Sequence, residues 1–208
     1  MTAPRGRLEL TWTNKSERLL AHEDGAYEWL PRADYRVAEV RLLRDAGTTG
    51  ETHPDAERAK DNLLIRGDAL HALTSLNELP ELAREIQGKV RLCYLDPPFN
   101  TQQAFAQYDD ALEHSVWLTM MRDRLLQVKK LLSPDGSVWV HCDDYEQHRL
   151  RCLLDEAFAG GFVATVLWQK RYSRDNRPAI GAVHDFIHVY SRDPEAWKAR
   201  RNRLPRDG

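Results

Sequence analysis

An acid, two prolines and an aromatic residue follow one another directly after a short apolar run, in the stretch Val90-Arg91-Leu92-Cys93-Tyr94-Leu95-Asp96-Pro97-Pro98-Phe99. The two prolines stiffen the backbone and remove two N–H donors, so the turn offers mainly carbonyl acceptors beside the Asp96 carboxylate. Phe99 adds a flat face on which a nucleobase can stack. Acceptors beside a stacking surface suit the exocyclic amino group of a base, because that group presents two N–H donors in one plane.

Two junctions between an apolar run and a polar loop would position such side chains. The run from Val90 to Leu95 predicts a buried strand, and open α/β sheets place ligand sites at the loop after such a strand. Earlier in the chain, residues 62–65 predict a strand, Gly67 permits a tight turn, and Asp68 caps a following helix. The apolar face of that helix is made of Leu70, Leu73 and Leu76.

Helix and strand patterns alternate through the rest of the chain. Upstream, the alternation over residues 8–15 predicts a strand, residues 35–43 predict a helix, and residues 45–61 predict a loop. Downstream, the predicted elements are a helix over 116–132, a turn over 133–136, a strand over 137–142, a helix over 145–158, and strands over 162–168 and 184–190. This alternation predicts an α/β fold with a parallel-rich sheet.

Composition describes a globular protein with a real core. The chain has 208 residues, of which 42% are hydrophobic and 30% charged, and its net charge is −2. No apolar run has the length of a membrane span and the amino terminus does not resemble a signal peptide, so we expect no membrane partner and a cytoplasmic location. The three cysteines form no CxxC or Cys/His spacing, and we expect reduced core thiols and no metal site.

The Asp-Pro-Pro-Phe motif resembles motif IV of the amino-methyltransferases that act on DNA, whose pattern is (D/N/S)PP(Y/F/W). The longer string YLDPPFNT resembles the adenine-specific enzymes of the β motif order, including the Mod subunits of type III restriction-modification systems. The segments GSVWVHCDD, Trp168-Gln169-Lys170 and HDFIHVYS resemble later segments of the same family in the same order, so the resemblance spans about residues 8–195. It implies a Rossmann-like class I methyltransferase sheet.

The resemblance also implies a reaction and a set of site residues. The cofactor would be S-adenosylmethionine and the substrate double-stranded DNA, with Asp96, Pro97, Pro98 and Phe99 at the catalytic site. An acid at the first motif position favours adenine N6 over cytosine N4, where the family more often has serine. Asp68 would lie beside the adenine end of the cofactor, and a plain helix cap is the alternative, compatible with the first. Lys170 and Arg171, in one of two basic stretches, would contact DNA phosphates, and a solvated loop is the alternative.

One family feature is missing from the sequence. The FxGxG segment that binds the cofactor follows the catalytic half in this motif order, and Phe158-Ala159-Gly160-Gly161-Phe162 lacks its spacing and reads as a helix end. We therefore expect an incomplete methyltransferase sheet, with a lead-in and linker over residues 1–60, the catalytic region over 61–195 and a charged tail over 196–208. The partners to expect are a carboxyl-terminal half or a restriction subunit, and a homodimer is left open.

Two other functions compete with a catalytic methyltransferase region. A noncatalytic DNA-binding or assembly subunit that retains the fold is the main alternative, and a failure to bind S-adenosylmethionine would favour it. A nucleotide-dependent oxidoreductase is disfavoured, because neither strand that precedes a helix carries GxGxxG.

Overall fold

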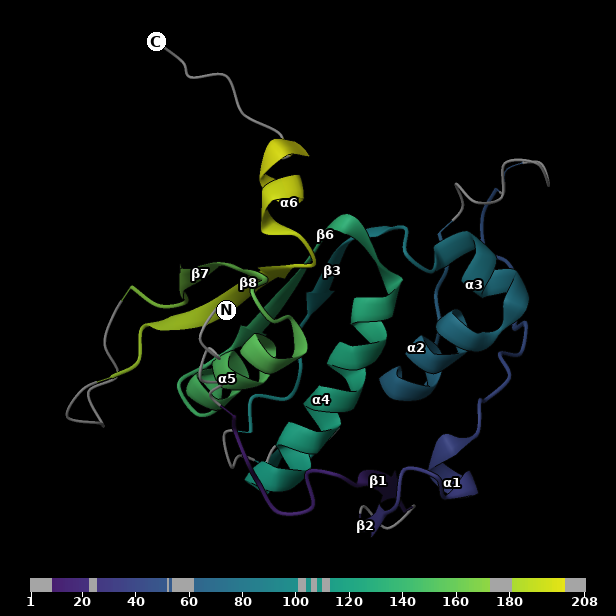
Figure 1. The fold of residues 1–208 in the computed structure, drawn as a ribbon, viewed down its shortest axis with the longest axis horizontal. Coiled ribbons are helices and arrows are strands. Elements are labelled where there is room, and N and C mark those ends of the chain that lie inside the picture. The colour runs from purple at the N-terminus through teal and green to yellow at the C-terminus, as the bar shows by residue number, and fades with distance from the viewer. Residues whose placement is uncertain are drawn as a thin grey trace, which may run out of the picture.

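A four-stranded mixed sheet is the centre of the molecule (Figure 1). The structure is a computed structural model that describes residues 9–22, 26–51, 53, 62–100, 104–105, 108–109, 113–172 and 181–200. The strands are β3 (Val90–Leu95), β6 (Leu132–Cys142), β8 (His184–Ser191) and β7 (Phe162–Gln169), in that spatial order. The predicted α/β fold is confirmed.

The strand directions differ from the prediction of a parallel-rich sheet. β3 and β6 are parallel, but β8 is antiparallel to both of its neighbours, β6 and β7. The chain passes from β7 to the adjacent β8 without an intervening helix among the described residues, and such a direct return produces an antiparallel pair. In β3, Cys93 and Leu95 pack against the core, whereas the alternate side chains Leu92 and Tyr94 lie on the opposite face and are 57% and 49% exposed, so the prediction of a buried strand was wrong for that face.

Two amphipathic helices cover one face of the sheet. In Figure 1, α4 (His114–Leu131) and α5 (Gln147–Ala157) lie across the sheet, and α2 (Ala69–Glu78) and α3 (Pro80–Ile86) lie on the flank of α4 away from α5. The short α6 (Pro194–Arg200) contacts β6 and β8. Both predicted inward faces are confirmed, since the following side chains are buried in one core: Leu118, Met121, Leu125, Val128, Leu132, Leu150, Leu153, Leu154 and Phe158.

The predicted turn over residues 133–136 lies inside a strand instead. β6 begins at Leu132, which pairs with Val90, and the next pair along the two strands joins Leu92 to Ser137. The additional residues of β6 form an irregular bulge. A Cβ atom at Gly136 would lie 2.6 Å from the carbonyl oxygen of Val90, so only glycine fits this close approach. The glycine-containing sequence that resembles a turn thus shapes a bulge.

The amino-terminal region has shorter elements than predicted. Residues 13–16 form a turn, and the first strands are β1 (Arg18–Ala21) and β2 (Tyr27–Leu30), which pair with each other. The predicted strand over 8–15 is wrong for its described part, residues 9–15, because side chains bind the backbone there: Lys15 Nζ donates to the Leu10 carbonyl, and Arg122 donates to the carbonyls of Lys15 and Glu17.

The helix predicted over 35–43 is limited to α1 (Tyr35–Ala38). Beyond it, Val40 and Leu43, which would continue the apolar stripe, are 38% and 36% exposed, so too little of the stripe is buried to stabilise a longer helix. The strand predicted over residues 62–65 does not form either, and Leu63 and Leu64 are 62% and 94% exposed. An apolar run becomes a strand only where a neighbour accepts its backbone hydrogen bonds, and no described strand pairs with these residues.

The remaining features are small. β4 (Ala104–Phe105) and β5 (Tyr108–Asp109) form a two-stranded ladder. The three cysteines form no disulfide with one another. Cys142 is buried in the main core and Cys93 packs against it, where burial raises the pKa of the Cys93 thiol to about 11. Among the helices that the structure describes, none combines the length and the apolar character needed to cross a membrane.

A buried histidine predicts how stability depends on pH. His188 is 2% exposed, its Nε2 lies 3.1 Å from the carbonyl oxygen of Gln147, and its Nδ1 lies 3.1 Å from the hydroxyl oxygen of Thr165. A neutral ring that donates from Nε2 and accepts at Nδ1 satisfies both contacts. Burial lowers the pKa of His188, so the unfolded chain binds a proton more tightly than the folded protein.

We therefore expect His188 to destabilise the fold progressively as pH falls below the unfolded imidazole pKa of about 6.5, because the unfolded chain then binds the proton that the folded protein binds more weakly. Urea unfolding at about pH 7.5 and about pH 5.5 measures this loss, which should be smaller in His188→Gln than in the wild type. The exposed His148 on α5 offers the control, because His148→Gln should keep the wild-type pH dependence. An equal pH dependence in His188→Gln would contradict the assignment.

Candidate active site

Four polar side chains form a row of contacts across the main sheet. Each of them lies at or next to the end of a different strand, on the same side of the sheet as the carboxyl end of β3. Asp96 follows β3, His141 lies at the end of β6, Asp185 lies at the start of β8, and Lys170 follows β7. His141 Nδ1 lies 3.8 Å from Asp96 Oδ1, and His141 Nε2 lies 3.4 Å from Asp185 Oδ2. Lys170 Nζ donates to Asp185 Oδ1 at 2.6 Å. The fold thus links two residues singled out from the sequence, Asp96 and Lys170, through two that were not.

The four side chains of this row differ in how far solvent reaches them. The side chain of Asp96 is 68% exposed, whereas those of His141 and Asp185 are 17% and 7% exposed. The Tyr94 hydroxyl lies 3.2 Å from His141 Nδ1. Desolvation, and after it the charge of Asp96, raises the pKa of Tyr94, so its hydroxyl keeps its proton at neutral pH. Asp96 is therefore the most exposed of the four side chains, and its carboxylate is open to a ligand.

The backbone after Asp96 is held from behind by the core. The carbonyl of Pro98 accepts a hydrogen bond at 2.8 Å from the indole N–H of Trp117, a fully buried residue of α4. Phe99 packs against the core, and its ring centroid lies 5.1 Å from that of His141 with an angle of 58° between the planes. One side of the aromatic face predicted for base stacking is thus already used by the His141 ring.

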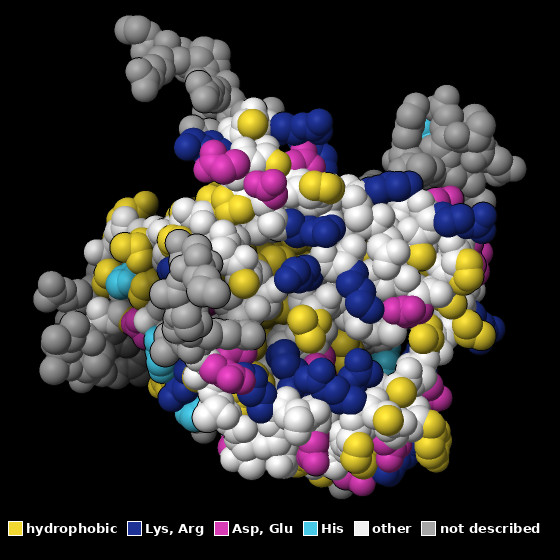
Figure 2. Space-filling model, viewed as in Figure 1, with side chains coloured by type: hydrophobic (Ala, Val, Ile, Leu, Met, Phe, Trp, Pro, Cys, Tyr) yellow, Lys and Arg dark blue, Asp and Glu magenta, His cyan; other side chains and the backbone are white. Residues whose placement is uncertain are grey.

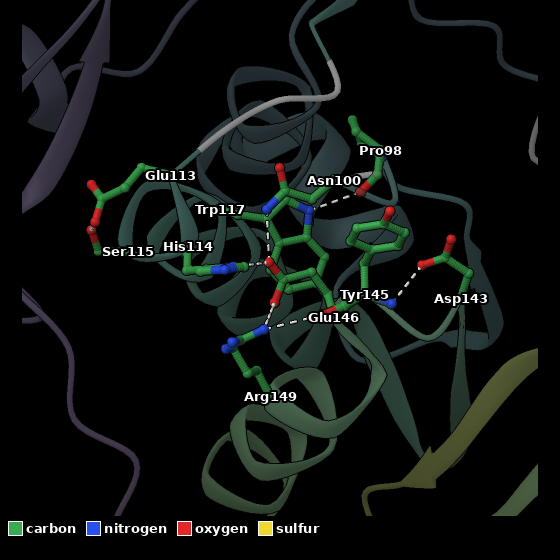
Figure 3. A network of polar contacts seen from close by, with 10 residues as sticks. All are labelled: Pro98, Asn100, Glu113, His114, Ser115, Trp117, Asp143, Tyr145, Glu146 and Arg149. Atoms are coloured by element: carbon green, nitrogen blue, oxygen red, sulfur yellow. Dashed lines mark hydrogen bonds and ion pairs between the residues drawn. The ribbon is translucent and has the colours of Figure 1, made fainter. Parts of the chain in front are cut away.

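A buried polar network fixes the residue that follows Phe99. Figure 3 shows Asn100 with Glu146 at the start of α5, His114 at the start of α4, and Arg149. The Asn100 side-chain amide donates to Glu146 at 2.7 Å, and Arg149 donates to the other carboxylate oxygen at 3.3 Å. The residues on both sides of Phe99 are therefore hydrogen-bonded to the helices that cover the sheet, Pro98 to Trp117 of α4 and Asn100 to Glu146 at the start of α5.

Asp68 belongs to a different cluster. Its carboxylate accepts hydrogen bonds from the backbone N–H groups of Leu70 and His71, which confirms the predicted helix cap. Its second oxygen lies 2.7 Å from Arg124 of α4, and the side chain is 47% exposed. The positive φ of Gly67, +148°, provides the predicted turn before it. The cofactor role remains a prediction, and no described contact joins Asp68 to Asp96.

The two predicted DNA contacts have different surroundings. Lys170 is ion-paired with Asp185, and its side chain is 29% exposed. Arg171 is exposed, and its backbone N–H donates to the Val183 carbonyl. Of the other arginines in the two basic stretches, Arg200 is described and lies 3.4 Å from Asp135. Arg174, Arg177, Arg201, Arg203 and Arg206 lie outside the described residues.

Lys and Arg side chains also gather across the face that α4 covers (Figure 2). On α4 itself, Arg124 and Lys130 pair with Asp68 and Glu78. Because Arg124 and Lys130 are ion-paired within the protein, we assign no DNA contact to these two residues.

The sequence did not single out four residues that support the site, namely Trp117, His141, Glu146 and Asp185, and it gave Asn100 only as part of the string YLDPPFNT, without a role of its own. The sequence could have indicated His141 and Asp185, because both are polar residues at the ends of predicted strands, and ligand sites of α/β sheets lie at such ends. Trp117 and Glu146 gave no local signal, since they contact the loop only after the helices have packed.

A comparison with protein-family models adds a decisive finding to this geometry. The model described as DNA methylase, of the N6/N4 type, matches residues 90–206, which include the Asp-Pro-Pro-Phe loop and strands β6, β7 and β8. The chain belongs to the DNA methylase family. The resemblance stated from the sequence is thus confirmed, and the strand-end residues described above lie within the DNA methylase region.

Individual relatives agree with the DNA methylase assignment. The chain is 45% identical over 148 residues to the HindVI Mod subunit of a type III restriction-modification enzyme from Haemophilus influenzae, covering 69% of this chain and 19% of the relative. It is 27% identical over 215 residues to the EcoPI Mod subunit of Escherichia phage P1, covering 86% and 32%. The chain thus spans a third or less of the length of these relatives.

Among solved structures, the chain is similar to a DNA modification methylase from Thermus thermophilus in complex with S-adenosyl-L-methionine. The sequence identity is 14%, the match covers 68% of this chain and 57% of the other, and the TM-score is 0.44.

Proposed function

We propose that this chain is the catalytic region of a DNA methyltransferase that transfers a methyl group from S-adenosylmethionine to N6 of adenine in double-stranded DNA. One observation carries the proposal: in a member of the DNA methylase family, the exposed Asp96 carboxylate stands next to a proline turn whose far end is anchored in the core. A fixed set of acceptors at the carboxyl end of a strand is what recognition of an amino group requires.

The chemical problem is the weak nucleophilicity of the amino group, whose lone pair is conjugated with the adenine ring. A hydrogen bond from N6–H to Asp96, and a second to a main-chain carbonyl of the turn, would draw the nitrogen toward tetrahedral geometry and free its lone pair. Because Trp117 already bonds the Pro98 carbonyl, the carbonyls of Asp96 and Pro97 are the better candidates for the second acceptor. Phe99 would stack on the adenine once it has left the duplex.

Bound S-adenosylmethionine supplies a methyl group on a positively charged sulfur. For its adenosine we retain Asp68, which is 47% exposed. The carboxylate oxygens that cap α2 and pair with Arg124 keep further lone pairs for ribose or adenine donors, so the present contacts fit this role.

The names of the relatives suggest partners, which we include in the proposal. Mod subunits belong to type III restriction-modification enzymes, so a restriction subunit and a carboxyl-terminal half with further cofactor contacts are the partners to test. A homodimer and a cytoplasmic location remain predictions from the sequence.

The test is a methylation assay with labelled S-adenosylmethionine and unmethylated DNA. The chain is assayed alone and together with the part of the HindVI Mod subunit that follows the region of similarity, and the nucleosides are then separated. N6-methyladenine that depends on this chain supports the proposal. N4-methylcytosine would contradict the choice of base, and no methylated base with both parts folded would favour a noncatalytic DNA-binding subunit.

Arg171 provides a prediction about DNA affinity. An exposed guanidinium that contacts one phosphate contributes through counterion release, so Arg171→Gln should weaken binding equally for all sequences and reduce the slope of log K against log salt by about 1. Fluorescence anisotropy with a labelled duplex at several salt concentrations measures this slope. Arg84→Gln is the matched control, because Arg84 is an exposed arginine on α3 and belongs to neither basic stretch. The same slope in Arg171→Gln and the wild type would remove Arg171 from the DNA contact.

A further inference from the structure

A carboxylate lies completely buried beside the catalytic loop without capping the helix that it precedes. Glu146 is 0% exposed and occupies the N-cap position of α5, yet its side chain makes no hydrogen bond to the first turn of that helix. Serine, threonine, aspartate and asparagine are the usual residues at such a position. Burial of a charge is costly unless it is paired and hydrogen-bonded, so the contacts of Glu146 should explain its presence.

Those contacts come from three separate parts of the chain (Figure 3). One carboxylate oxygen accepts the side-chain amide of Asn100 at 2.7 Å and also contacts the Nδ1 atom of His114. The other oxygen accepts from Arg149 at 3.3 Å. Glu146 therefore joins the end of the catalytic loop to the first turns of α4 and α5.

Asn100 shows why the loop needs this support. It is fully buried and has a φ of +61°, in the left-handed region that asparagine tolerates better than most residues but at a cost. Its neighbour Phe99 has no side-chain polar group that could fix its position. The Pro98 carbonyl on one side is held by Trp117, and Asn100 on the other side is held by Glu146.

We propose that Glu146 is a positioning residue for methyl transfer, which holds Asn100 and thereby fixes Phe99 and the Asp-Pro-Pro turn in the geometry that receives the base. The inference rests on the proposed function. Glu146 is too deeply buried to touch the substrate, so it acts through Asn100. A displacement of reacting groups by about 1 Å costs about a hundredfold in rate, which makes such support measurable.

Swapping the amide and the carboxylate between Asn100 and Glu146 tests their hydrogen bond. The enzyme for this test is the chain together with the added part of the HindVI Mod subunit, as in the methylation assay. Glu146→Gln should lower the single-turnover rate of methyl transfer by about 10- to 100-fold. Asn100→Asp should be at least as slow, because it brings two carboxylates together. The double variant Asn100→Asp with Glu146→Gln restores an amide beside a carboxylate, and it should be about tenfold faster than the Asn100→Asp variant. A double variant as slow as the slower single variant would overturn the proposal.

A carboxylate on the same helix gives the matched control. Glu156 accepts from Lys15 at 2.9 Å and from the Leu10 backbone N–H, far along α5 from the loop. Glu156→Gln should lower the melting temperature and leave the single-turnover rate unchanged. A rate loss in Glu156→Gln equal to that in Glu146→Gln would mean that both act only through general stability, and would also overturn the proposal.

Hydrogen exchange provides a readout that does not depend on activity. The backbone amides of Phe99 and Asn100 should exchange faster in Glu146→Gln than in the wild type, and should be unchanged in Glu156→Gln. Faster exchange in Glu146→Gln, together with a wild-type protein that never methylates DNA, would support the positioning of the loop while contradicting the proposed function. Unchanged exchange in Glu146→Gln would overturn the positioning role, whatever the methylation assay shows.

Discussion

Replacement of Asp96 by alanine should reduce methyl transfer to adenine by about 100- to 1,000-fold, because loss of one positioned acceptor of this kind raises the barrier by about 2.7–4 kcal/mol. Asp96→Asn should be intermediate, since an amide retains one carbonyl acceptor but loses the charge. The single-turnover rate at saturating S-adenosylmethionine is the quantity to measure.

The same variants should leave the fold almost intact. Asp96 is 68% exposed and its nearest ionic contact, with His141, is 3.8 Å long, so little folding free energy depends on it. Asp144→Ala is the matched control, because Asp144 is an exposed acid that follows the adjacent strand β6. It should keep the wild-type rate. Near-normal turnover in Asp96→Ala, with a melting temperature equal to that of the wild type, would contradict the proposed mechanism.

The sequence predicted correctly those helices and strands whose apolar residues recur at the spacing that places them on one buried side. The helical spacing from Leu118 to Val128 and the run from Val90 to Leu95 became α4 and β3, because each presents an apolar side that one packing partner can bury. The apolar residues 62–65 failed as a strand, because strand formation depends on a neighbour that the pattern does not specify. The bulge at Gly136 was missed for a related reason, since it exists only through its contact with Val90.

The candidate site likewise has one part that the sequence predicted and one part that only the structure shows. The acceptor turn from Asp96 to Phe99 is contiguous, so its chemistry could be stated from residue types alone. The chain from His141 through Asp185 to Lys170 depends on the order of β6, β8 and β7 in the sheet, which the sequence does not give. Contacts between residues far apart in the chain thus decide how firmly the acceptors are held, and only the folded structure shows them.

Trp117 is where this long-range support should have its largest effect on stability. The side chain is 0% exposed within the main core, and its indole N–H bonds the Pro98 carbonyl at 2.8 Å. Trp117→Ala should lower the free energy of unfolding by about 3–5 kcal/mol, because it removes a large buried ring and leaves a cavity. Trp117→Phe keeps an aromatic ring but leaves the carbonyl without this donor, so we expect about 1–3 kcal/mol.

The phenylalanine variant separates packing from loop support. Urea unfolding gives its stability, and the single-turnover rate at a temperature where it remains folded should still fall, because the proline turn has lost an anchor. Trp139→Phe is the control, since Trp139 also donates its indole N–H, to Ser137 at 3.1 Å, within β6. That variant should transfer methyl groups at the wild-type rate. If Trp117→Phe matched it in rate, Trp117 would serve the core alone, and the catalytic turn would owe its geometry to its own prolines and to the bond between Asn100 and Glu146.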